Sequence, residues 1–113
     1  TMAQRDETKR QTANEILDTS MLIDGHRGQT TVFSIIEFPP AITGCFVIWP
    51  TREDYDTAVL LATKLRLVGK PIGCTDILIA SICFNRKATL VTKDTDFSAV
   101  MGVEKTFSCK IIK

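Results

Sequence analysis

Four acidic residues stand at the ends of apolar stretches, and their type and spacing could support chemistry on a shared ion. Asp18 follows EIL, Glu37 follows TTVFSII, Asp76 precedes ILIASICF and Asp94 follows ATLVT. A carboxylate is rarely buried without a partner, because removing its charge from water costs several kcal/mol unless positive charge offsets the loss. The pattern therefore predicts that the four acids share one metal site.

Carboxylates in one crevice repel one another, since two unit charges about 4 Å apart interact with about 4 kcal/mol at an effective dielectric constant of about 20. They must take up protons or bind a cation. Oxygen is the only ligand type on offer, so we expect Mg²⁺ or Mn²⁺. Such an ion makes a bound water more acidic and steadies charge on phosphoryl oxygens, which points to cleavage of phosphodiester or phosphate-ester bonds.

A scaffold of alternating strands and helices is expected to bring these acids together. Strands are predicted at residues 15–17, 30–36, 45–49, 88–92 and 106–112. Helices are predicted at about residues 21–26, 51–68, 76–86 and 96–101. The alternation predicts an α/β fold, a three-layer α/β/α sandwich around a central, mainly parallel sheet of about five strands. The carboxyl ends of parallel strands line one crevice, where the acids should meet.

Polar residues next to the predicted helices indicate where those helices begin. Thr51 and Asp54 form a weaker version of the capping box, and Thr19 or Ser20 can cap the first helix. Asp96 is expected to cap the last helix, which gives it a structural role rather than a place on the metal ion.

Length and composition indicate one domain at residues 15–113, preceded by a polar N-terminal tail at residues 1–14. The tail lacks the apolar run of an export signal and no segment is long enough to cross a bilayer, so we expect a cytoplasmic protein without membrane contact. Because the net charge is only +1, any polyanion must bind a local basic patch.

The cysteines and aromatic residues are expected to fill the structure rather than do chemistry. The four cysteines form no CxxC pair and the chain has one histidine, which argues against zinc and favours reduced thiols, mostly in the core. The aromatic residues are expected to fill the core or a subunit interface rather than stack on bases, and they include Phe33, Phe38, Phe46 and Trp49.

The order of the acidic motifs resembles the PIN domain, and most closely the VapC-type toxins of toxin–antitoxin pairs. The resemblance runs from about residue 16 to residue 112 through LDTSMLIDGHRG, SIIEF, GCTDILIAS and LVTKDTDF. It is specific as an ordered set, because acids follow the first two strands, a third begins a D-x-L-I-A helix and a fourth lies in a T-x-D-x-D-F segment.

This resemblance implies an α/β/α fold, a Mg²⁺- or Mn²⁺-dependent ribonuclease activity on an RNA substrate, and a cognate antitoxin that blocks the site. A homodimer is the usual state of the family. By the same resemblance, the catalytic and metal-binding acids are Asp18, Glu37, Asp76 and Asp94. Ser20 and Thr92 match small hydroxyl positions that support the acids or bound waters in relatives, and Asp96 is similar to an additional acid near the cluster in some members.

The leading hypothesis is therefore a metal-dependent endoribonuclease that acts on single-stranded or loop RNA. Arg27 and Lys93 are the best candidates for contacts with RNA phosphates, because each lies near a proposed metal-site acid in the sequence.

Three alternatives stay open. A catalytically silent PIN-like module would bind RNA or a protein partner and take up no Mn²⁺. A phospho-accepting receiver domain would need a phosphorylatable Asp after the third strand, where this chain has Pro-Thr-Arg, and would gain an acyl phosphate from a small phosphodonor. A phosphatase using Asp94-Thr95-Asp96 would carry its D-x-D motif on the first strand instead.

Overall fold

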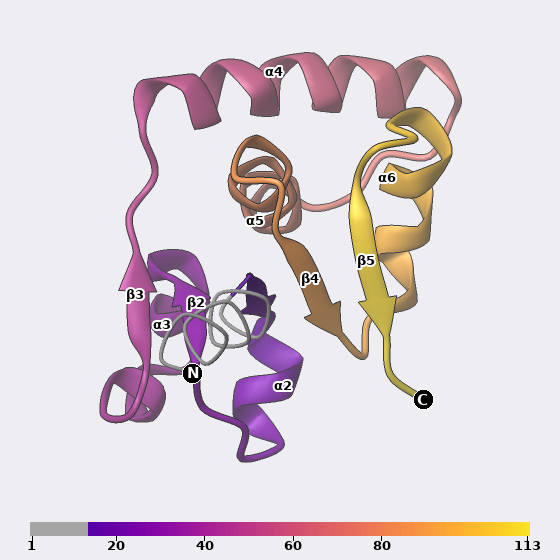
Figure 1. The fold of residues 1–113 in the computed structure, drawn as a ribbon. Coiled ribbons are helices and arrows are strands. Elements are labelled where there is room, and N and C mark those ends of the chain that lie inside the picture. The colour runs from indigo at the N-terminus through magenta and orange to yellow at the C-terminus, as the bar shows by residue number, and fades with distance from the viewer. Residues whose placement is uncertain (1–13) are drawn as a thin grey trace, which may run out of the picture.

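The computed structural model describes residues 14–113, so the predicted polar tail lies outside the described residues except for Asn14. Figure 1 shows the elements of this range, whose bounds are, in chain order, β1 (Glu15–Leu17), α2 (Thr19–Ile23), β2 (Gln29–Thr31), α3 (Val32–Glu37), η1 (Pro39–Ile42), β3 (Phe46–Ile48), α4 (Arg52–Leu67), α5 (Cys74–Asn85), β4 (Thr89–Thr92), η2 (Thr95–Phe97), α6 (Ser98–Val103) and β5 (Ser108–Ile111).

The five strands form one parallel sheet in the order β3-β2-β1-β4-β5, so the predicted parallel α/β architecture is confirmed. β1 lies at the centre and pairs with both β2 and β4. The carboxyl ends of these strands consequently lie at one edge of the sheet, and the residues that follow β1 and β4 are neighbours there.

Alternate side chains of the strands face two hydrophobic clusters on opposite sides of the sheet. Ile16 and Leu90 are register partners and belong to the larger cluster, which includes buried residues of α4, α5 and α6. Leu17 packs instead against the smaller cluster, whose buried members come from α2, α3 and η1. This alternation is the period of two expected of a strand covered on both faces, and it produces the three layers.

The predicted strand at residues 30–36 is wrong beyond its second residue. β2 ends at Thr31, and α3 takes up the apolar residues that follow. The Thr31 hydroxyl accepts a hydrogen bond from the backbone N–H of Ser34 and so caps the helix. Ser34 and Ile35 are both buried and Ile36 and Glu37 are both exposed, which fits a helix face rather than the alternation of a strand, so tertiary packing has overridden the preference of β-branched residues for strands.

The first helix also begins differently from the prediction, because Asp18 takes the N-cap position and neither Thr19 nor Ser20 does. By contrast, the predicted capping box of α4 is confirmed. Thr51 Oγ1 accepts from the N–H of Asp54, and Asp54 Oδ2 accepts from the N–H of Thr51 at 2.7 Å.

A buried carboxylate joins the beginning of α4 to the end of α5. Asp54 is fully buried and accepts hydrogen bonds from Arg86 Nη1 at 3.0 and 3.1 Å and from Asn85 Nδ2 at 2.9 Å. Burial alone would raise the pKa of Asp54, but the bonds from Arg86, Thr51 and Asn85 hold it below the ordinary value. The pair thus fixes α4, which crosses one end of the molecule in Figure 1, against α5.

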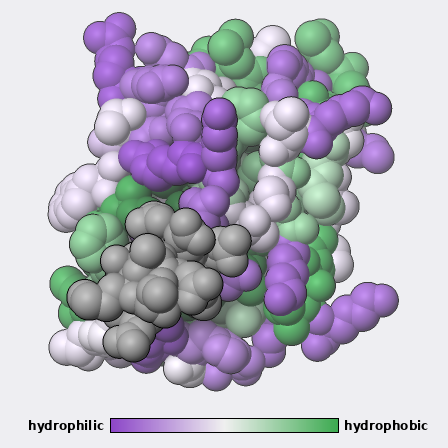
Figure 2. Space-filling model, in the orientation of Figure 1, coloured by the Kyte–Doolittle hydropathy of each residue, from purple (hydrophilic) through white to green (hydrophobic). Residues whose placement is uncertain are grey.

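Two of the four aromatic residues that were expected to fill the core or an interface are exposed. Phe33 and Phe38 pack against the two clusters as predicted, whereas Phe46 is 71% exposed and Trp49 is 69% exposed, so these two do not fill the core. On the face shown in Figure 2, the apolar side chains that are not covered by grey atoms form separate patches between polar ones. The subunit interface remains a prediction.

The four cysteines are free thiols, as predicted, although Cys74 is exposed rather than part of the core. None of the helices within residues 14–113 is long and apolar enough to cross a membrane.

Replacing Asp54 by Ala should lower the free energy of unfolding by about 3 kcal/mol, because Arg86 would lose its buried partner and α4 its capping box. Thermal or urea unfolding measures this change. Asp56→Ala on the same helix is the matched control, since its ion pair with Arg52 is exposed and should contribute less than about 1 kcal/mol. Equal losses in the two variants would contradict the structural role given to Asp54.

Candidate metal centre

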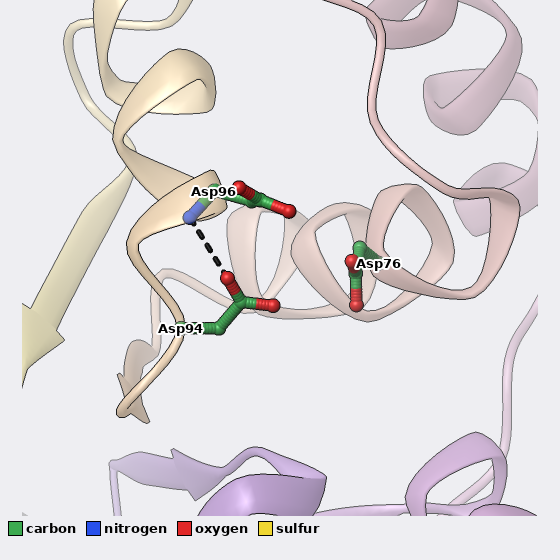
Figure 3. A group of neighbouring side chains, drawn as sticks. All are labelled: Asp76, Asp94 and Asp96. Carbon is green, nitrogen blue, oxygen red and sulfur yellow. Dashed lines mark hydrogen bonds between the residues drawn. The ribbon is translucent and has the colours of Figure 1, made fainter.

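Three carboxylates meet between α5 and the segment that follows β4. One oxygen atom from each of Asp76, Asp94 and Asp96 lies within 4.8 Å of the other two. Asp76 is in the first turn of α5, and Figure 3 shows the carboxylates of Asp94 and Asp96 facing it from the neighbouring segment. α5 leads into β4, and the proximity of these carboxylates shows that the first turn of α5 lies near the carboxyl end of β4.

Asp96 does not cap a helix, contrary to the prediction. The N-cap of η2 is Asp94, whose Oδ1 accepts a hydrogen bond from the N–H of Asp96 at 2.9 Å. The reason is that a 3-10 turn precedes α6 and moves the start of helical structure toward β4. The Asp96 carboxylate therefore caps no helix and lies beside the carboxylates of Asp76 and Asp94.

Asp18 is 4% exposed, and hydroxyl groups hold one of its oxygens. Its Oδ2 accepts hydrogen bonds from Thr92 Oγ1 at 2.7 Å and from Ser20 Oγ at 3.1 Å. These hydroxyls accept in turn from the backbone N–H groups of Asp94 and Lys93, at 2.9 and 3.0 Å. The chain of bonds ties the end of β1 to the end of β4 and orients the Asp18 carboxylate.

Glu37 is the last residue of α3 and does not follow a strand, so the structural reason for choosing it from the sequence was wrong. It is exposed, and its Oε1 accepts a hydrogen bond from Thr19 Oγ1 at 2.6 Å. Thr19 Oγ1 also lies 3.0 Å from Ser34 Oγ. Sequence reasoning missed both hydroxyls, although the spacing of three between Ser34 and Glu37 places them on one face of a helix.

The pKa of Asp76 reflects the charges of the four other acids. Its pKa is raised to about 6, mainly by burial and then by the negative charges of Asp18, Asp94, Glu37 and Asp96. Asp18 and Glu37 are thus close enough to influence Asp76, although neither belongs to the group whose oxygens lie within 4.8 Å.

The composition of the cluster fits a hard divalent cation. All of its potential ligands are carboxylate oxygens, the donor type that Mg²⁺ and Mn²⁺ prefer. Within residues 14–113, no ion pair neutralises these five acids and the Asp76 carboxylate accepts no hydrogen bond from the protein. A bound cation would supply the positive charge that the surrounding side chains lack.

The two predicted RNA-binding residues are held by other groups. Lys93 Nζ lies 2.8 Å from Asp24 Oδ2, and this contact lowers the pKa of Asp24. Arg27 Nη1 donates to the carbonyl oxygens of Leu22 and His26 at 2.9 and 2.8 Å. Lys93 follows β4 at the acidic edge, whereas Arg27 precedes β2 and lies toward the opposite end of that strand.

Asp76→Asn should stabilise the metal-free protein at a pH well above 6. Because the folded protein raises this pKa, the charged form of Asp76 destabilises the fold at high pH, and this destabilisation disappears as the pH falls toward the ordinary value of 3.8. Thermal unfolding in a chelator, measured across this pH range, should therefore show a gap between variant and wild type that closes toward acid pH. A gap that does not change with pH would contradict the origin given for it.

No protein-family model and no curated protein matches the sequence, but solved structures match the fold. VapBC-5 from Mycobacterium tuberculosis, of the VapBC family of toxin–antitoxin systems, has a chain with a TM-score of 0.73 and 21% identity, covering 88% of this chain and 97% of that chain. VapBC2 from Rickettsia felis, bound to a DNA fragment from its promoter, gives a TM-score of 0.71 at 15% identity, covering 88% and 98%.

VapBC-1 from nontypeable Haemophilus influenzae gives a TM-score of 0.69 at 16% identity, covering 86% of this chain and 96% of that chain. At these identities the likeness concerns the fold. The predicted PIN-like α/β/α architecture is confirmed, and this chain has the fold of the VapBC toxin–antitoxin chains to which it is similar.

Proposed function

We propose that this protein is a Mg²⁺- or Mn²⁺-dependent endoribonuclease and the toxin of a VapBC-type toxin–antitoxin pair. The observation that carries the proposal is the convergence of Asp76, Asp94 and Asp96 at one sheet edge. The charges of Asp18 and Glu37 also contribute to the raised pKa of Asp76. The likeness to VapBC structures supports a cognate antitoxin as partner. A homodimer is a further part of the proposal.

The acids that would hold the ion are Asp18, Glu37, Asp76 and Asp94, with Asp96 beside them. When bound, the ion would supply an acidified water and offset the charge on the phosphoryl oxygens of RNA. Ser20 and Thr92 orient Asp18 by donating to its Oδ2. Burial and neighbouring charge favour a proton on Asp76 when no cation is present, so cation binding and protonation compete at this carboxylate.

Lys93 is the better placed of the two proposed phosphate contacts. Lys93 follows Thr92 at the acidic edge of the sheet. Its ammonium group forms an ion pair with Asp24, which is exposed at the end of α2. An RNA phosphate near the cluster could share this ammonium group with Asp24, since lysine presents three N–H donors. Arg27 would contact RNA only farther from the acids.

Asp76→Asn and Asp94→Asn should each reduce Mn²⁺-dependent cleavage of single-stranded RNA at least about 100-fold, because each removes charge that the ion needs while keeping the side-chain shape. Gel-based cleavage assays measure the loss, and Asp56→Asn, an exposed acid on α4, is the matched control. Wild-type protein that takes up no Mn²⁺ in calorimetry and cuts no RNA would favour the silent binding module instead.

Lys93→Ala should weaken RNA binding and lower the slope of log affinity against log salt concentration by about 0.7, the effect of one lost phosphate contact on a single strand. Fluorescence anisotropy at several salt concentrations, with the inactive Asp76→Asn background, gives this slope. Lys105→Ala is the control, because Lys105 precedes β5 at the opposite sheet edge. An unchanged slope for Lys93→Ala would exclude the contact.

A further inference from the structure

Glu37 is the acid of the proposed site that most needs support from its surroundings. It is exposed and ends α3, where the negative end of the helix dipole disfavours a carboxylate. Its long side chain also has more rotamers than an aspartate. Among residues 14–113, the hydrogen bond that holds this carboxylate comes from Thr19, with 2.6 Å between Thr19 Oγ1 and Glu37 Oε1.

The Thr19 hydroxyl has one hydrogen and two acceptor oxygens within reach. Thr19 Oγ1 lies 2.6 Å from Glu37 Oε1 and 3.0 Å from Ser34 Oγ, and it can donate to only one of them at a time. The shorter contact is to a carboxylate oxygen, the stronger type of acceptor, so the hydrogen bond to Glu37 is favoured. Ser34 is fully buried and its backbone N–H is bonded to Thr31, so the fold holds the second acceptor in place.

Thr19 also ties Glu37 to the acid that precedes it. Thr19 is the residue after Asp18, whose backbone N–H donates to the carbonyl of Val91 at 2.9 Å. The position of the Thr19 hydroxyl is therefore set by the central strands, and through it the position of the Glu37 carboxylate relative to Asp18. The β-branched side chain of threonine favours this arrangement because it has few χ1 rotamers.

We propose that Thr19 is a positioning residue that holds the Glu37 carboxylate at the metal centre. The inference rests on the proposed function to the extent that Glu37 contributes to cation binding. The role differs from those of Ser20 and Thr92, which donate to Asp18.

Calorimetric titration of the metal-free protein with Mn²⁺ tests this role without depending on RNA cleavage. Thr19→Val should weaken Mn²⁺ binding about tenfold, as expected for a residue that orients a metal ligand, and Thr19→Ser should restore most of the affinity. Ser34→Ala should leave the affinity nearly unchanged, since it removes only the competing acceptor and the Thr19 hydroxyl remains. Thr63→Val is the matched control, because the exposed Thr63 bonds only to its own helix.

A double-mutant cycle with Glu37→Gln separates positioning from a general effect on the fold. If Thr19 acts through Glu37, Thr19→Val should cause no further loss of affinity in the Glu37→Gln background. The proposal is overturned if Thr19→Val binds Mn²⁺ like the wild type, or if it weakens binding equally in both backgrounds. Should Thr19→Val unfold, Thr19→Ala with the same cycle decides between these outcomes. Wild-type protein that binds no Mn²⁺ would instead remove the proposed function itself, and the inference with it.

Discussion

Repulsion among carboxylates gathered at one edge of the sheet is the constraint on which the rest of this structure depends. Burial, as the largest cause, and the charges of Asp18, Asp94, Glu37 and Asp96 together raise the pKa of Asp76 to about 6. A protein holds such an arrangement only if its scaffold is rigid and if something offsets the charge. The parallel sheet supplies the first condition, because β1 and β4 place Asp18 and Asp94 on adjacent strand ends.

The contrast between Asp54 and Asp76 shows how the surroundings decide the state of an acid. Asp54 is the more buried of the two, yet Arg86, Asn85 and Thr51 keep it charged and join α4 to α5. Asp76 lies at the other end of α5 with no basic partner in the part of the chain that the structure describes. One acid therefore stabilises the fold, and the other creates the demand for a cation on which the proposed nuclease activity depends.

Different hydroxyl groups hold two of the acids, Asp18 and Glu37. Ser20 and Thr92 bond to Asp18, whereas Thr19 bonds to Glu37. Neighbouring residues at the start of α2 thus serve different carboxylates, because successive helix positions point in different directions.

The sequence by itself determined the five strands, the helices α2, α4, α5 and α6, the parallel sheet and the capping box of α4, because these follow from local periodicity and from the side chains next to each helix start. It did not determine that α3 replaces most of the strand predicted before Glu37, or that Asp94 rather than Asp96 caps η2. Nor did it reveal Thr19 as a partner of Glu37. Packing against the two clusters and contacts between distant segments decide these features, and only the folded chain brings such groups within hydrogen-bonding distance.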